Sequence, residues 1–269
     1  MTVRQVVTAS RGFERPYGSL SVARADLLAL VREGLLQRQE IPRVGPGECE
    51  RLYFLSRRAG RVVPELRDLP KGAAAFRPVP LTQFEHAMGV ASFLSLVHRD
   101  VAGSQGRARL LRALGDRQLR IPVDARVYGL ENGFVIPDGT VLLELDGQLQ
   151  LLFLELMNRG GVIRPGIPAS IARSFAAKLW RYKALVKSLG NCGVLRSLFR
   201  EHGRELPPGF RVLVVSTRGA DHLEHLRQAA GDFRTMVYFA RLVSLETSSS
   251  MLTEGVWRLP SGLVRGISD

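Results

Sequence analysis

Two carboxylates in the middle of the chain have a spacing that suits chemistry. Asp138 belongs to a Pro-Asp-Gly triplet, and Glu155 interrupts the apolar run Phe-Leu-Glu-Leu-Met. The Asp146–Gly147 dipeptide between them is a strong hairpin signal. Asp138 lies 8 residues before Asp146, and Glu155 lies 8 residues after Gly147. Antiparallel pairing would therefore bring the two acids roughly opposite each other. Because an ionised glutamate in an apolar strand is costly without a partner, we expect a cation near Glu155.

A third charged residue, Lys178, is a candidate for that cation. We predict a long helix from Pro168 to Leu189, and at about 100° per residue Lys178 falls inside its apolar stripe. A lysine there either extends to solvent or meets a carboxylate. Together with Asp138 and Glu155 it would suit phosphodiester hydrolysis with Mg²⁺ or Mn²⁺. The metal would activate water while lysine stabilises developing negative charge. The same spacing also fits a purely structural Lys178–Glu155 ion pair.

The elements around these residues follow an α/β pattern. Residues 81–269 read as a helix, antiparallel strands, a helix, a strand, a helix and a strand, which is typical of a mixed sheet covered by helices. The predicted elements are a helix at 82–98, a basic loop or helix around Arg107–Arg117, strands at 126–130, 140–145 and 149–156, the helix at 168–189, a strand at 210–217, a helix at 220–230 and a strand at 236–245.

The first part of the chain has a different organisation. A short helix over residues 2–8 and a helix capped by Ser19 or Ser21 and ending near Gly34 precede two short strands around a Pro/Gly turn. A helix followed by a hairpin is the second half of a winged helix-turn-helix. In that interpretation the phosphate-contacting candidates are Arg24, Arg32, Arg38 and Arg43. An ordinary helix–hairpin packing unit with solvated arginines fits the pattern equally well.

We therefore expect a winged-helix-like domain over residues 1–70, a linker over 71–80 and a second domain over 81–269. Charge supports a polyanionic partner, since 38 Lys+Arg against 25 Asp+Glu give a net charge of +13. Only four of the basic residues are lysine, and arginine suits phosphate and guanine contacts, although a GC-rich genome would produce the same bias. The chain lacks a membrane-spanning run and has only two cysteines, so we expect a cytoplasmic protein.

The order of several short motifs resembles the replication-relaxation family of plasmids and mobile elements. The resemblance covers nearly the whole chain and rests on Tyr53-x-Leu55-Ser56-x-x-x-Gly60, His86-x-x-x-Val90, Pro137-Asp138-Gly139, Phe153-x-Glu155, Lys178-x-x-x-Tyr182, Arg211 to Val215, and Trp257-Arg258-x-Pro260. It implies an N-terminal winged helix joined to a mixed-sheet domain similar to the PD-(D/E)xK nuclease superfamily. It also implies a role in plasmid or phage DNA replication, maintenance or mobilisation.

Under this resemblance each site residue takes a role. Asp138 corresponds to the Asp of the "PD" element and Glu155 to the acid of the next strand, and these two would bind the metal. Met157 stands where the lysine of the motif usually lies, and Lys178 would supply that amine from the following helix. Glu85, His86 and Tyr182 are accessory candidates.

Two functions follow as hypotheses. The first is a metal-dependent DNA endonuclease or nicking enzyme directed by the winged helix. The second is a non-catalytic DNA-binding replication initiator or transcriptional regulator built on a degenerate nuclease fold. Both have DNA as the partner and neither involves a membrane. A protein-interaction scaffold that uses the exposed face of the last helix and the tail is a third hypothesis, which only the absence of all DNA binding would favour. The sequence leaves open whether the chain forms a homodimer.

Overall fold

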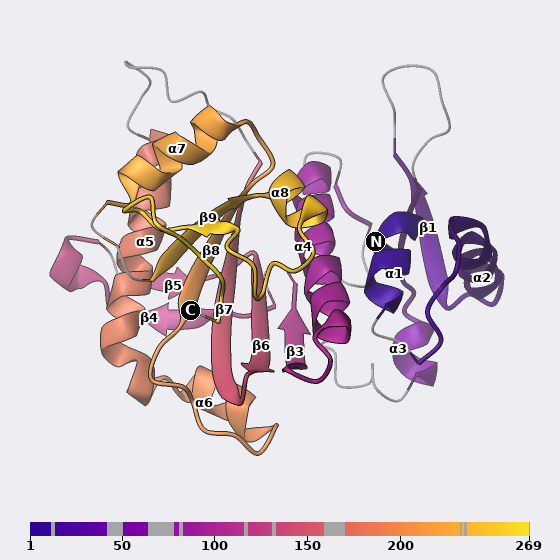
Figure 1. Cartoon of the computed structure of the whole chain (residues 1–269). Coiled ribbons are helices and arrows are strands. Elements are labelled where there is room, and N and C mark those ends of the chain that lie inside the picture. Colours follow the sequence, from indigo (N-terminus) through magenta and orange to yellow (C-terminus); the bar gives the residue numbers. More distant parts are fainter. Residues whose placement is uncertain are drawn as a thin grey trace. The chain divides into compact units, whose positions relative to one another are not determined.

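A computed structural model describes most of the chain (Figure 1). The described residues are 1–11, 14–41, 51–63, 78–80, 83–115, 118–130, 133–158, 170–231, 233 and 236–268. The chain divides into two compact units, Met1–Gly103 and Ser104–Asp269.

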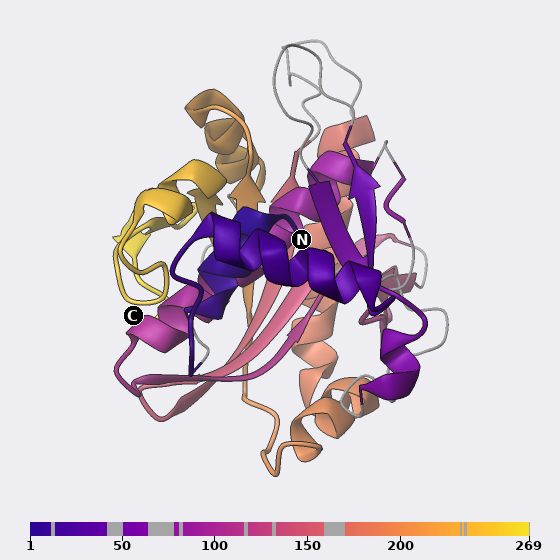
Figure 2. The same cartoon turned by 90° about the vertical axis from the view of Figure 1, so that its right-hand side faces the viewer.

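The first unit contains four helices and one hairpin among its described residues. They are α1 (Val3–Ser10), α2 (Leu20–Arg32), β1 (Leu36–Glu40), β2 (Arg51–Leu55), α3 (Ala59–Val62) and α4 (Phe84–Gly103). Ser19 caps α2 by accepting a hydrogen bond from the Val22 N–H at 3.2 Å, and Gly34 after the helix has a φ of 71°, which glycine adopts without strain. Figure 2 shows α2, the hairpin and α3 in one view. The predicted helix and hairpin are therefore confirmed.

Helix α4 belongs to this unit, whereas the sequence pattern predicts it at the start of the second domain. Gln5 gives the physical reason. Its backbone and side chain form a capping box with Thr2 at the start of α1. The same side-chain amide donates to the Met88 carbonyl and to the Ser92 hydroxyl, both at 3.0 Å. The two helices are thus joined by partly buried hydrogen bonds.

The second unit is built on one mixed sheet with helices, which confirms the predicted α+β fold class. Its strand order is β11-β10-β9-β8-β7-β6-β3. The bounds are β3 (Ala108–Leu114), β4 (Ile121–Val123), η4 (Arg126–Tyr128), β5 (Gly133–Val135), β6 (Gly139–Leu145), β7 (Gln148–Met157), α5 (Ser170–Ser188), η5 (Leu189–Asn191), α6 (Gly193–Arg200), β8 (Arg211–Ser216), α7 (Ala220–Ala229), β9 (Val237–Arg241), α8 (Leu242–Thr247), β10 (Trp257–Arg258) and β11 (Val264–Arg265).

The β6–β7 hairpin forms as the sequence predicts. Asp146 and Gly147 have φ values of 49° and 76°, the positive angles that a two-residue type I′ turn requires. The register pairs Gly139 with Leu154. One step further along the ladder lie Asp138 and Glu155, and the Asp138 N–H still donates to the Leu154 carbonyl at 2.9 Å.

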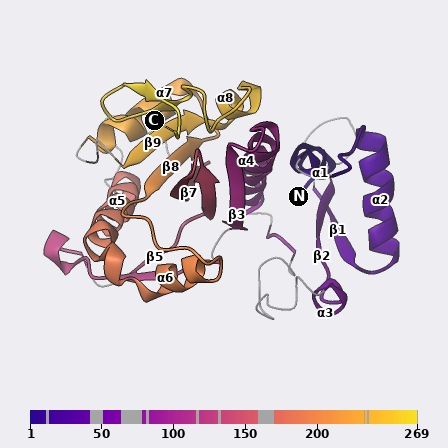
Figure 3. The ribbon, with the colours of Figure 1, turned by 60° about the horizontal axis from the view of Figure 1, so that its bottom comes forward.

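Strands β7, β8 and β9 run parallel, and helical crossovers connect them. Apolar residues of α5, α6 and α7 share one buried cluster with this part of the sheet, including Leu179, Leu195, Leu223, Phe153 and Val214. Figure 3 shows α5, α6 and β5 on the same side of the sheet. Because side chains alternate along a strand, Phe153 and Glu155 of β7 share one face, and this is the face that α5 covers.

Three predicted elements differ from the structure. The basic segment around Arg107 is strand β3, which pairs antiparallel with β6 and carries a bulge between Leu110 and Arg112. Its arginines lie near acidic residues: Arg107 with Asp146, Arg109 with Glu144, and Arg112 with Glu201. Residues Arg126–Tyr128 form a 3₁₀ turn, and Asp124 accepts the Arg126 N–H at 3.1 Å. The strand predicted to end at 245 ends at Arg241, where α8 begins.

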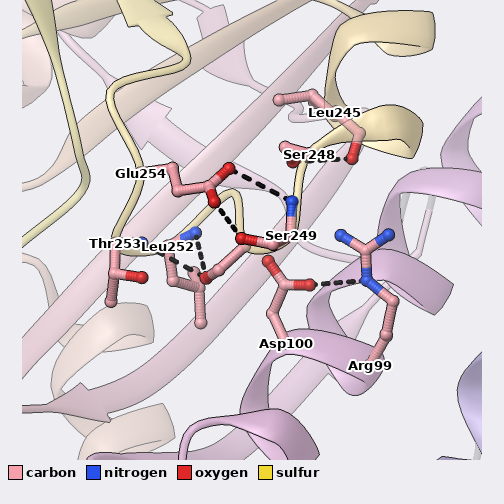
Figure 4. Close-up of polar contacts among 9 residues, drawn as sticks. Arg99, Asp100, Leu245, Ser248, Ser249, Leu252, Thr253 and Glu254 are labelled. Carbon is pink, nitrogen blue, oxygen red and sulfur yellow. Dashed lines mark hydrogen bonds and ion pairs between the residues drawn. The ribbon is translucent and has the colours of Figure 1, made fainter.

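The C-terminal segment is held by a polar turn (Figure 4). The Ser248 hydroxyl donates to the Leu245 carbonyl at 2.9 Å, and Glu254 accepts hydrogen bonds from the hydroxyl and the N–H of Ser249. Trp257 is fully buried and its indole N–H donates to the Met251 carbonyl at 2.7 Å. Among the described helices, none is both long enough and apolar enough to cross a bilayer.

Candidate functional site

Asp138 is held at the entrance to β6 by the backbone of β7. Its side-chain Oδ2 accepts a hydrogen bond from the Leu156 N–H at 2.7 Å, and the residue is 8% exposed. With its own N–H bonded to Leu154, the aspartate is tied to β7 on both sides of Glu155. This arrangement fixes the position of one carboxylate oxygen and orients the other, Oδ1, toward α5, where Lys178 lies 3.9 Å away.

Glu155 lies inside β7 and is 1% exposed, so it has almost no contact with water. Both of its oxygens have partners on α5. Oε2 contacts the Lys178 ammonium at 2.5 Å, and Oε1 accepts a hydrogen bond from the Tyr182 hydroxyl at 2.7 Å. A buried carboxylate with a cation and a hydroxyl donor satisfies the requirement that buried charge be paired and hydrogen-bonded.

One helical turn of α5 supplies both partners. Lys178 and Tyr182 are four residues apart and therefore lie on the same helix face. Tyr182 is 1% exposed and packs its ring near Phe153, with 5.5 Å between centroids. The Lys178 side chain is 42% exposed, so its stem crosses the apolar stripe while its ammonium stays at the boundary with solvent. The structure thus brings Asp138, Glu155 and Lys178 together.

The electrostatics of this cluster raise the proton affinity of Glu155. Burial, and next the negative charge of Asp138, raise the pKa of Glu155 to about 7, although Lys178 and Tyr182 oppose the shift. Burial also raises the pKa of Tyr182 well above its usual value, and the neighbouring Glu155 adds to that shift. Tyr182 therefore remains a hydrogen-bond donor, while Glu155 exchanges a proton near neutral pH.

The other predicted site residues lie in the first unit. Glu85 is exposed and His86 is half-buried, both at the start of α4. Arg24 and Arg32 are exposed on α2, and Arg38 is exposed on β1.

The Nη2 atom of Arg38 lies 3.8 Å from Oε1 of Glu40 on the same strand. Because both side chains are exposed, we assign little stability to this pair. The remaining predicted DNA contact, Arg43, falls outside the described residues.

A small pocket adjoins the acid pair and was not anticipated from the sequence. Its volume is about 140 Å³. The lining includes Phe134, Ile136, Glu155, Lys178, Arg181 and Tyr182. The spacing of Arg181 indicates that it lies near the site, because it comes one residue before Tyr182 and three residues after Lys178. Residues three apart are neighbours on a helix surface. Phe134 and Ile136 gave no such signal, since short strands such as β5 carry too little periodicity.

Within the described parts of the chain, no cluster of three or more His, Cys, Asp or Glu side chains forms a metal site. The two acids are thus the available carboxylate donors at this position. Comparison with protein-family models, curated protein sequences and solved structures gives no match. The resemblance to the replication-relaxation family accordingly stays a prediction.

Proposed function

We propose that the second unit is a metal-dependent phosphodiester hydrolase that cuts or nicks DNA, within a protein of plasmid or phage replication or mobilisation. One observation carries the proposal: Asp138 and Glu155 meet at the end of a hairpin, and Lys178 contacts both. Two acids and an amine, of which Glu155 and Lys178 line a pocket, are the groups that phosphoryl-transfer chemistry uses for charge stabilisation.

The donor set fits Mg²⁺ or Mn²⁺. Both ions prefer carboxylate oxygens, and Asp138 and Glu155 would hold the ion. When both acids are ionised, Lys178 neutralises only one of the two negative charges, so the cluster retains a net negative charge that favours a further cation. When bound, the metal would polarise a phosphate and lower the pKa of an attacking water.

The chain's own residues have distinct tasks in this proposal. The Leu156 N–H orients Asp138, and the Tyr182 hydroxyl orients Glu155. Both acids therefore keep their geometry without substrate, as preorganised sites require. Lys178 is the mobile member, because its half-exposed ammonium can leave Glu155 for a phosphate oxygen when a nucleic acid strand enters.

DNA is the proposed substrate because of charge. The net charge of +13 resides mostly in arginines. Arg24, Arg32 and Arg38 are exposed, as phosphate contacts must be. The α2–hairpin unit would then serve as a winged-helix-like DNA-binding module, in a cytoplasmic protein.

Cleavage of supercoiled plasmid with Mg²⁺ or Mn²⁺ tests the hydrolase. Asp138→Asn and Glu155→Gln keep the side-chain shape but remove the negative charge, and each is expected to reduce cleavage roughly a hundredfold or more. Asp221→Asn makes the same chemical change at an exposed position on α7 and should cleave like the wild type. If the wild type does not cleave, or if both acid variants retain activity, the proposal fails.

The second candidate is a non-catalytic DNA-binding protein, and two observations favour it. Met157 replaces the usual motif lysine. The acids are also satisfied by Lys178, Tyr182 and the Leu156 N–H without a metal.

This candidate predicts metal-independent DNA binding that weakens with salt. Neutralising Arg24, Arg32 and Arg38 together is expected to reduce the slope of log affinity against log salt by about 2.7, at about 0.9 per phosphate contact. A slope unchanged by the triple variant would remove these arginines from the DNA contact.

A further inference from the structure

The pocket beside the acid pair combines flat apolar surface with positive charge. Phe134 and Ile136 form apolar lining and are 39% and 38% exposed. On the opposite element, Lys178 and Arg181 contribute two cations, against the single acid Glu155. Aromatic surface next to cationic groups is the combination that binds a nucleotide, whose base stacks and whose phosphate pairs with the cation.

Arg181 lines the pocket and has a polar atom that is unpartnered within the described part of the chain. Its Nε is buried and has no hydrogen-bond partner among the described residues. The guanidinium also lies close to the backbone of β5, since a Cβ added at Gly133 would be 3.5 Å from that Nε. Arg181 is partly buried as a residue and lines the pocket, so a phosphate oxygen there would form a charge-assisted bond with its guanidinium.

Phe134 offers the stacking surface. It faces outward from β5, while the next residue, Val135, is 3% exposed and turned into the core. One face of the Phe134 ring is covered by the Arg120 guanidinium, 3.6 Å from the ring centroid. That contact holds the ring and adds positive charge beside it. The rest of the exposed ring lines the pocket.

The size of the pocket limits the ligand. At about 140 Å³, it is smaller than the roughly 300–1,000 Å³ of sites that enclose whole cofactors or drug-sized molecules. It therefore suits one part of a longer strand. In addition, a base can reach Phe134 only when it is not stacked inside a double helix.

We infer that this pocket holds an unstacked nucleotide of a single DNA strand, with its phosphate on Arg181 and its base on Phe134. The inference rests on the proposed function, because it assigns the substrate of that site as a single-stranded or frayed region. Phe134 lies four residues before Asp138, and Arg181 lies three residues after Lys178. The chain from β5 to β6 and the helix α5 would therefore deliver the neighbouring phosphate to the acids.

Binding of a fluorescent thymidine oligonucleotide to the full chain, measured in EDTA, tests this inference without catalysis. Phe134→Ala is expected to weaken binding roughly 5- to 100-fold, the effect of losing one stacked base, with no change in the salt slope. Phe134→Trp should retain the affinity. Arg181→Gln should weaken binding and reduce the salt slope by about 0.7, as expected for one phosphate contact to a single strand.

Matched controls are Leu263→Ala and Arg196→Gln, which make similar changes at exposed positions of the same unit. Duplex DNA of any sequence should bind Phe134→Ala and wild type equally. The inference is overturned if both pocket variants bind the oligonucleotide like the wild type, or if free thymidine monophosphate binds as tightly as the oligonucleotide. Plasmid cleavage by Asp138→Asn is measured separately, so a failure of the pocket assignment can be distinguished from a failure of the proposed hydrolase.

Discussion

The buried Glu155 makes a specific prediction about pH and stability. Its pKa is about 7 in the folded protein, against a model-peptide value of 4.5 that applies when the chain is unfolded. The folded state therefore holds a proton more tightly than the unfolded state does. The contribution of Glu155 to the free energy of unfolding is fully present below about pH 4.5 and is lost as pH rises through about 7.

The magnitude follows from the shift. A difference of 7 − 4.5 corresponds to about 3 kcal/mol, since each pKa unit is worth about 1.4 kcal/mol. Glu155→Gln keeps an acceptor for the Tyr182 hydroxyl and removes the proton equilibrium. Lys178 loses its ion pair at modest cost, because its 42% exposed side chain can turn to water. We therefore expect the variant to match or exceed the wild type at about pH 8 and to lose that advantage at about pH 5.

Urea denaturation in EDTA at several pH values measures this difference. The quantity to compare is the change in unfolding free energy between about pH 5 and about pH 8, wild type against Glu155→Gln. The exposed Glu205→Gln is the matched control and should follow the wild-type profile. Parallel profiles for wild type and Glu155→Gln would show that Glu155 does not change its proton affinity on folding, and the electrostatic reasoning would be wrong.

Two further predictions concern single contacts. Tyr182→Phe removes the only hydroxyl donor to Glu155 among the described residues. We expect it to lower the free energy of unfolding by about 1–3 kcal/mol at about pH 8, as measured by urea denaturation. An unchanged free energy of unfolding would mean that this hydrogen bond contributes no net stability. Gly147→Ala forces a side chain onto a φ of 76° and should cost about 1–2 kcal/mol. Gly193→Ala, where an added Cβ meets nothing within 4 Å, should be neutral or slightly stabilising. Equal melting temperatures for the two variants would contradict the turn assignment.

The sequence predicts the part of the site that depends on local rules. The Asp146–Gly147 turn sets the register of the hairpin, and this register alone places Asp138 beside Glu155. The apolar stripe of α5 similarly directs Lys178 toward the sheet. These predictions succeed because a two-residue turn and a helical period leave few alternatives.

Other features depend on packing that the sequence does not reveal. A bulge between Leu110 and Arg112 interrupts the two-residue alternation of side chains along β3. Without that alternation, the sequence of β3 resembles that of a basic loop or helix. The pocket also escapes prediction because Phe134 and Arg181 come from elements that meet only in the folded unit. The roles of Arg24, Arg32 and Arg38 stay predictions, since their exposure is compatible with DNA contact and equally with solvation.

The origin of the three charged groups affects the order in which the chain can assemble them. The two acids come from one short hairpin, whereas Lys178 comes from the long crossover between β7 and β8. Closing that crossover costs more chain entropy than closing the hairpin. Chain entropy therefore favours pairing the two carboxylate-bearing strands over docking Lys178. In a hairpin that α5 does not yet cover, both carboxylates stay hydrated, so burial under the helix that carries Lys178 and Tyr182 is the step that raises the proton affinity of Glu155.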